Sequence, residues 1–295
     1  MDLAPSPATA PYQGAPPSLG PVKVEVASLS KAYDDLQRGE VLAVDRLSFQ
    51  AHAGEVFGLL GPNGAGKTTA LRILTTLLKP TSGVALVNGF DCVRQEELVR
   101  NQIGFISANT AVYDRMTAWE FVEYFGRLHG LAAGPLRERM EWLFAKLRMD
   151  DLRDTLGAKM STGMKQKTSI ARALVHDPPV IVFDEATNGL DAFAARASLD
   201  AVAELRDEGK CVVFSTHIMS EVQRICDRIA VMHRGRIIDS GPTDDLRQRH
   251  GEQNLEELFF RLIRDADELA DRRKGDEGME GDKGMVDRRD EGDSG

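Results

Sequence analysis

The chain has few cysteines, no long apolar run and no excess of basic residues. Its 295 residues include three cysteines, Cys92, Cys211 and Cys226, and no two of them form a CxxC pair. So sparse and odd-numbered a set argues against a disulfide framework and favours a reducing compartment. No apolar stretch reaches the roughly 18 residues of a membrane-spanning helix, and the N-terminus lacks a basic segment followed by an apolar one. We therefore expect neither a membrane span nor a secretory signal, so any spanning helices would come from another chain.

The charge balance of the chain is acidic. There are 46 Asp and Glu residues against 37 Lys and Arg residues, which gives a net charge of -9. Binding to nucleic acid phosphates needs clustered basic side chains, so this balance argues against a nucleic-acid partner. Hydrophobic residues make up 42% and charged residues 28% of the chain. These fractions are typical of a globular protein with a sizeable core.

The two ends of the chain differ from the segment between them. Residues 1–21 contain six prolines and one charged residue, and residues 266–295 are mostly charged, with several glycines. Neither stretch has the apolar residues to bury a core. We therefore expect a disordered leader and a disordered charged tail on either side of one domain at 22–265.

Within that domain, apolar runs that suit strands alternate with helical patterns. The expected strands are 22–26, 56–60, 84–87, 103–106, 180–183, 212–214 and 229–232. The expected helices are 67–77, 117–130, 136–148, 163–176, 192–208, 218–226 and 255–263. This alternation indicates an α/β fold with a largely parallel sheet. Residues 113–176 interrupt it with helical patterns alone, which indicates a helical subdomain.

A glycine-rich motif follows the strand expected at 56–60. Gly61-Pro62-Asn63-Gly64-Ala65-Gly66-Lys67-Thr68 fits the pattern GxxxxGK[ST], and Thr69 continues it into the next helix. Glycines let such a loop wrap a phosphate so that backbone N–H groups and the helix N-terminus face its oxygens. The motif predicts that residues 61–69 bind ATP, with Lys67 on the β- and γ-phosphates and the Thr68 hydroxyl on Mg²⁺. The alternative is a glycine-rich turn with a surface lysine, which the strand–loop–helix context disfavours.

Two carboxylates end another expected strand. The apolar run 180–183 is followed directly by Asp184 and Glu185. A buried parallel strand is apolar throughout, and ligands bind at the carboxyl ends of such strands. We predict that Asp184 helps to hold Mg²⁺ and that Glu185 polarises the water that attacks the γ-phosphate. An ordinary strand end with solvated acids is the alternative, and the phosphate loop upstream favours the catalytic interpretation.

Three further segments, in order along the chain, resemble motifs of the ABC ATPase family. The segment 160–167 is similar to the LSGGQ-type signature, with Ser161 and Gly163 in matching positions and Thr162 in place of a usual glycine. The segment 188–191 resembles the D-loop, with Asp191 in its matching place, and 214–217 resembles the switch segment that ends in a histidine, here His217. The resemblance extends over about residues 22–265.

The resemblance implies a fold and a set of roles. The fold would be a P-loop NTPase of the ABC ATPase type, with a mostly parallel sheet, an antiparallel β part and an inserted helical subdomain. His217 would contact the γ-phosphate, Tyr33 would stack on adenine, and Asp191 would belong to the nucleotide site. Ser161 and Gly163 of one chain would cap ATP held on the phosphate loop of a second ATPase chain, a homodimer if the two are identical.

The family also implies a partner and a place. Its transport members hydrolyse ATP to drive an integral-membrane permease, and the helical subdomain at about 113–176 would be the permease contact. The protein would then be cytoplasmic and peripheral on the inner face of the cell membrane. The signature, the segment 110–117 and the C-terminal Leu-Glu-Glu-Leu-Phe pattern are similar to the sodium-export branch, which favours export. The family's usual Gln after the strand 103–106 is replaced by Ala108, and we hypothesise that Asn109 substitutes for it.

Other functions fit the sequence less well. A non-transport ABC ATPase of the DNA-repair type would carry a long coiled coil between its two nucleotide motifs, and the ribosome-associated type usually has two cassettes in one chain. A metabolic P-loop kinase would leave the Ser161 signature and the His217 segment without a role. A nucleotide-binding regulator would release no phosphate.

Overall fold

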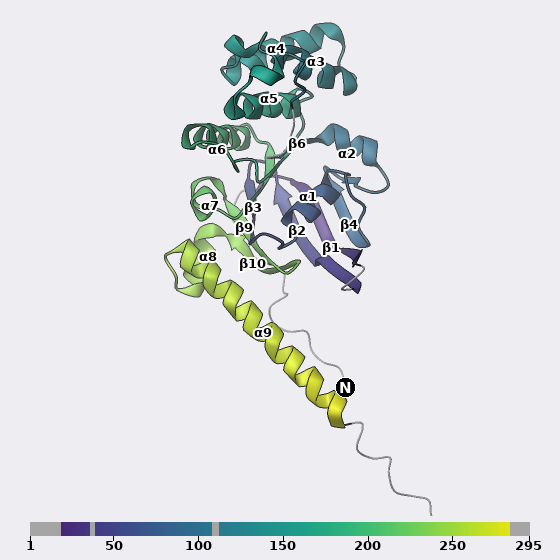
Figure 1. Cartoon of the computed structure of the whole chain (residues 1–295), viewed down its shortest axis with the longest axis vertical. Helices are drawn as coiled ribbons and strands as arrows, with labels where there is room; N and C mark the ends of the chain where they lie inside the picture. The colour runs from purple at the N-terminus through teal and green to yellow at the C-terminus, as the bar shows by residue number, and fades with distance from the viewer. Residues whose placement is uncertain (1–18, 36–38, 108–111, 284–295) are drawn as a thin grey trace, which may run out of the picture.

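The structure, a computed structural model, describes residues 19–35, 39–107 and 112–283 (Figure 1). The strands are β1 Val22–Asp35, β2 Gly39–His52, β3 Val56–Leu60, β4 Ser82–Val87, β5 Phe90–Asp91, β6 Ile103–Ser107, β7 Val180–Asp184, β8 Cys211–Thr216, β9 Arg228–His233 and β10 Arg236–Pro242. The α-helices are α1 Lys67–Leu74, α2 Glu96–Gln102, α3 Ala118–Leu128, α4 Ala133–Lys146, α5 Thr162–Leu174, α6 Ala192–Asp207, α7 Met219–Ile225, α8 Thr243–His250 and α9 Leu255–Lys283. Two short 3-10 helices, Asp150–Leu152 and Gly157–Lys159, lie between α4 and α5.

The strands form two sheets. One has six strands in the order β10-β9-β3-β8-β7-β6, and all of its pairs are parallel except β10 with β9. The other has four strands in the order β2-β1-β4-β5, and every pair in it is antiparallel. The expected α/β fold with a mostly parallel sheet and an antiparallel part is confirmed.

Strand β7, which lies between β8 and β6, is buried on both faces of the six-stranded sheet. Val180 and Val182 join the core that α1 and the antiparallel sheet share, whereas Ile181 and Phe183 join the core that includes α5 and α6. Successive side chains of a strand point to opposite faces, so a strand covered on both sides must be apolar at every position. This requirement explains the unbroken apolar run that ends at Asp184.

Helices α3, α4 and α5 gather at one end of the molecule, beyond the edge of the six-stranded sheet (Figure 1). They share buried side chains such as Phe121, Leu143, Phe144 and Ile170. The described residues between β6 and β7 contain no strand, as the helical patterns predicted. Thr117 begins α3 with a capping box, because its hydroxyl accepts a hydrogen bond from Glu120 N and the Glu120 carboxylate accepts one from Thr117 N.

The C-terminal helix corrects one expectation. We expected a disordered tail from residue 266, but α9 continues to Lys283. Its sequence beyond residue 263 has little apolar periodicity and includes three glycines, so the sequence pattern gave no signal for the extension, although its Glu, Arg, Lys and Ala residues favour helix. Asp267 also contacts the β9–β10 turn, with its Oδ1 2.7 Å from His233 Nε2 and 2.8 Å from Arg234 Nη2. The expected leader at 1–18 and the last residues, 284–295, lie outside the described part of the chain.

Candidate active site

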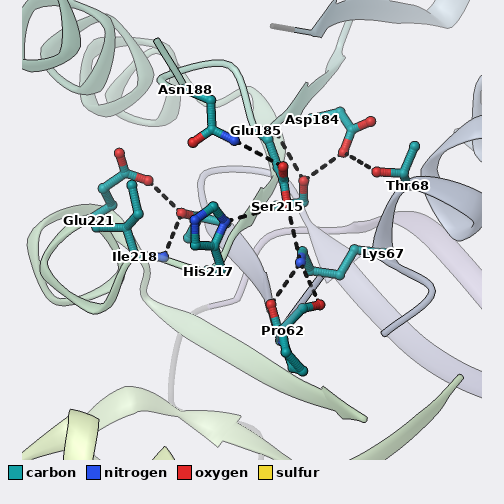
Figure 2. Close-up of polar contacts among 12 residues, drawn as sticks. Pro62, Lys67, Thr68, Asp184, Glu185, Asn188, Ser215, His217, Ile218 and Glu221 are labelled. Carbon is teal, nitrogen blue, oxygen red and sulfur yellow. Dashed lines mark hydrogen bonds and ion pairs between the residues drawn. The ribbon is translucent and has the colours of Figure 1, made fainter. Parts of the chain in front are cut away.

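Three strands of the parallel sheet end at the same edge. Leu60 at the end of β3 is paired with Thr216 of β8, and Asp184 at the end of β7 is paired with Ser215. The phosphate-loop motif follows β3, the two carboxylates lie at the end of β7, and His217 follows β8. The register of the sheet therefore brings these separate segments together (Figure 2).

The glycine-rich loop surrounds a cavity of about 290 Å³. The cavity is lined by Ala43, Asn63, Gly64, Ala65, Gly66, Lys67, Thr68, Thr69 and Glu185. Gly66 caps α1 with φ +100°, and a Cβ on it would lie 2.3 Å from the carbonyl oxygen of Ala43. Only glycine fits this position, because the backbone conformation is left-handed and strand β2 passes directly behind it. The cavity lies at the N-terminus of α1, where unpaired N–H groups attract an anion.

The Lys67 ammonium group is buried and is hydrogen-bonded to the backbone of this loop. Its Nζ donates hydrogen bonds to the carbonyl oxygens of Gly61 (2.7 Å) and Pro62 (3.1 Å). The same Nζ lies 3.2 Å from Glu185 Oε1. The carbonyls fix the position of the ammonium group, and the carboxylate balances its charge.

Asp184 is linked to two hydroxyl groups. Its Oδ1 accepts hydrogen bonds from Thr68 Oγ1 (3.1 Å) and from Ser215 Oγ (2.8 Å). Across the described residues, no group of three or more His, Cys, Asp and Glu side chains is arranged to hold a metal ion. One carboxylate beside one hydroxyl suits Mg²⁺, which is bound by few protein oxygens together with water and substrate phosphates. The residues present thus fit the metal that the sequence predicts.

Several neighbouring groups contact Glu185. Its backbone has φ +49°, an uncommon conformation for a residue with a side chain, and its N–H donates to both the carbonyl oxygen and the Oγ of Ser215. Its Oε1 lies near Lys67 and 3.6 Å from His217 Nδ1, while its Oε2 accepts a hydrogen bond of 2.9 Å from Asn188 Nδ2. The carboxylate therefore faces the same cavity as Lys67 and is fixed in direction.

The turn after β8 places His217 beside Glu185. Thr216 Oγ1 donates to the buried Glu221 carboxylate (2.6 Å) and accepts from Ile218 N (3.0 Å). These bonds hold the backbone on both sides of His217, whose side chain is 38% exposed. The imidazole lies beside Glu185 and lines a second hollow, which shares Asn63 with the phosphate-loop cavity.

Ser161, Gly163 and Asp191 lie in a different hollow. It has a volume of about 680 Å³ and lies among α4, α5 and α6, and these three residues are absent from the lining of the phosphate-loop cavity. Ser161 begins α5, where its Oγ accepts a bond from Met164 N, and Asp191 begins α6, where its Oδ1 accepts bonds from Phe193 N and Ala194 N. The single chain therefore does not bring the signature-like segment to its own phosphate loop.

Three other residues complete the comparison with the sequence. Tyr33 lies on β1 opposite Val41, is 43% exposed, and has Lys31 Nζ 5.2 Å from its ring centre. It does not line the phosphate-loop cavity. Ala108 and Asn109 lie outside the described residues, so the hypothesis about Asn109 stays a prediction.

Sequence reasoning missed Ser215 and Asn188 as site residues. Ser215 bonds both acidic residues at the end of β7, and Asn188 bonds the carboxylate of Glu185. The only signal available for either was its place in a segment already singled out, two residues before His217 and three before Asp191.

Comparison with known proteins agrees with this geometry. The family model described as ABC transporter matches residues 44–188. The chain is 40% identical to the ABC transporter ATP-binding protein NatA of Bacillus subtilis (strain 168), over 82% of this chain and 98% of NatA. The chain belongs to the ATP-binding subunits of ABC transporters. It is thus an ABC ATPase, as the sequence predicted.

Two further relatives of this ABC ATPase are informative. The Nod factor export ATP-binding protein I of Rhizobium sp. (strain N33) is 34% identical over 81% of this chain and 77% of that protein. The ATP-binding cassette MJ0796 has been solved as a dimer in a post-hydrolysis state bound to ADP and Pi. It is 25% identical with a TM-score of 0.67, over 74% of this chain and 98% of MJ0796.

Proposed function

We propose that this ABC ATPase closes on ATP as a head-to-tail homodimer and drives a separate membrane permease, in the direction of export. The observation that carries the proposal is the division of the site. The phosphate loop and Glu185 line one cavity, and Asp184 and His217 contact Thr68 and Glu185 beside it, whereas Ser161 and Gly163 lie in another hollow. A second copy supplies the missing cap.

The chemistry is transfer of the γ-phosphoryl group of ATP to water. Glu185 accepts a proton from the water as the new P–O bond forms, and the bond between the γ-phosphorus and the bridging oxygen breaks to release ADP. Lys67 neutralises charge on the phosphoryl oxygens, and His217 contacts the γ-phosphate. Thr68 and Asp184 hold Mg²⁺, which adds positive charge at the phosphates when bound, and Tyr33 stacks on adenine.

The signature-like segment supplies the cap from the second chain. Ser161 and Gly163 lie at the N-terminus of α5, where free N–H groups suit an anion. In a two-fold dimer each phosphate loop meets the other chain's Ser161, so one contact generates two equal sites. The dimeric state of MJ0796 supports this arrangement. Because the site closes only with ATP, binding energy becomes available to move a permease.

The helical region at about 113–176 is our candidate for the permease contact. Its exposed apolar side chains include Tyr113, Tyr124 and Leu128, which are 53%, 45% and 63% exposed. None of the helices in the described part of the chain is both long enough and apolar enough to cross a bilayer. We infer a peripheral position on the inner face of the membrane, held by the permease. The net charge of -9 is the reason we propose no nucleic-acid partner.

Mixing two inactive variants tests the shared site. Lys67→Ala removes the phosphate contact, and Ser161→Arg blocks the cap, so each variant alone should release no phosphate from Mg-ATP. In an equal mixture, half of the dimers hold one chain of each kind, and each of these has one intact site. Turnover should therefore return to about a quarter of the wild-type rate. Full activity of Ser161→Arg by itself, or no recovery in the mixture, would refute the shared site.

A further inference from the structure

Asn188 makes two hydrogen bonds to Glu185, which lies three residues before it in the chain. Its Nδ2 donates to Glu185 Oε2 at 2.9 Å, and its backbone N–H donates to the Glu185 carbonyl oxygen at 3.0 Å. Both bonds fall within one tight turn just after β7. The Asn188 amide belongs to the same turn as Glu185, so it stays beside the carboxylate when other parts of the site move.

The two oxygens of this carboxylate have different partners (Figure 2). Oε1 faces Lys67 Nζ at 3.2 Å and His217 Nδ1 at 3.6 Å, whereas Oε2 is bonded to Asn188 alone among the contacts that the described residues show. Lys67 and His217 are the groups that we assign to the γ-phosphate. When they turn to the phosphate, Oε1 loses the Lys67 ammonium group and the His217 imidazole as neighbours, and Oε2 keeps its amide.

We propose that Asn188 is a positioning residue that holds Glu185 by Oε2 and so keeps Oε1 aimed at the attacking water. The proposal rests on the proposed function, since it needs Glu185 to act on that water. A glutamate side chain has three rotatable bonds, and its direction is lost unless something fixes the carboxylate. A hydrogen bond to a charged acceptor is among the stronger ones available for this purpose.

A purely structural role for Asn188 predicts a different order of activity among its variants. The side chain lies in a turn, where Asn and Asp are both common because either can bond the nearby backbone. If the turn were all that mattered, Asn188→Asp would be harmless and Asn188→Ala would be the worse variant. If the amide donor matters, the order reverses, because a carboxylate of the same shape repels Oε2 while alanine merely leaves it unbonded.

The test compares these two variants in the full-length chain. Phosphate release from Mg-ATP gives kcat and KM, and a fluorescent ATP analogue gives nucleotide affinity. We expect Asn188→Ala to lower kcat about tenfold and Asn188→Asp about a hundredfold, with KM and nucleotide affinity within about twofold of wild type. Asn188→Ser, which keeps a shorter donor, should fall between wild type and Asn188→Ala. The nucleotide titration also shows that each variant is folded.

A second measurement checks that the effect passes through Glu185. In the Glu185→Gln background, Asn188→Asp should cause no further loss of residual turnover, because the group that it repels is gone. An Asn188→Asp variant as active as Asn188→Ala or more so, or a further loss in the Glu185→Gln background, would overturn the proposal. Full turnover by Glu185→Gln alone would instead overturn the proposed role of Glu185, and the two failures are thus told apart.

Discussion

Replacing Glu185 by Gln should tighten ATP binding as well as stop hydrolysis. Lys67 Nζ lies 3.2 Å from Glu185 Oε1, and the lysine side chain is only 3% exposed. A γ-phosphate that binds this ammonium group must compete with the carboxylate for it. Gln has nearly the same size and no charge, so the variant removes the competitor and leaves the cavity in place.

The size of the effect follows from the geometry of this ion pair. Two unit charges 3.2 Å apart attract each other by about 5 kcal/mol at an effective dielectric constant of about 20. Glu185 is 24% exposed, so water screens part of this attraction, and desolvation of both groups offsets most of the rest. We expect about 1 kcal/mol of net competition to be relieved, which is about a fivefold lower Kd for ATP.

The assay must separate binding to one chain from trapping of a dimer. Both proteins should therefore carry Ser161→Arg, and a fluorescent ATP analogue and its ADP counterpart should be titrated in Mg²⁺. ADP brings only its β-phosphate to Lys67, so its Kd should fall less than that of ATP. In the background with intact Ser161, Glu185→Gln should lower turnover by roughly 10²- to 10⁴-fold, as expected for loss of a general base. An unchanged Kd for ATP, or equal tightening for ADP, would refute the competition.

Three other outcomes can be measured. Gly66→Ala should abolish ATP binding in the same titration, because its Cβ would lie 2.3 Å from the Ala43 oxygen, whereas Gly209→Ala, with φ +83° and open space, should bind normally. Phe144→Ala empties a fully buried position and should cost about 3–5 kcal/mol in urea unfolding; a loss below about 1 kcal/mol would contradict this packing. Burial lowers the pKa of His176 to about 3, so below pH 6.5 the unfolded chain binds a proton that the folded chain does not. Stability should therefore fall by about 2 kcal/mol between pH 7 and pH 5 from this group, and His176→Asn should lose that much less in urea unfolding at the two values of pH.

Much of the parallel sheet could be predicted because its strands are buried on both faces. The run 180–183 is apolar at every position, and β7 begins at Val180 and ends at Asp184. The antiparallel strands were harder to predict. β2 covers residues 39–52 with one face exposed, and its mixed polarity offered no continuous apolar run. Strand β10 and helices α2 and α8 are short or mostly polar, so they were missed for the same reason.

The candidate site shows the same division between local and distant information. The phosphate loop could be predicted since its function depends on glycines and a helix start that are adjacent in the chain. The partners of Glu185 could not be predicted. Lys67 is more than a hundred residues away in the chain, and the pairing of three strands brings its Nζ to 3.2 Å from Glu185 Oε1. The bond from Asn188 is local, but no pattern of residue types distinguishes it from an ordinary turn.

The sequence by itself determined the family, the ATPase chemistry and the order of the motifs, because each depends on residue types at fixed short spacings. Only the tertiary structure decided which oxygen of Glu185 each neighbour holds, and that Ser161 lies in a different hollow from the phosphate loop. Those facts depend on strand register and on helices packed from distant parts of the chain. The spacing of residues along the chain does not determine the partners of the Glu185 oxygens or the location of Ser161, because three-dimensional packing sets both.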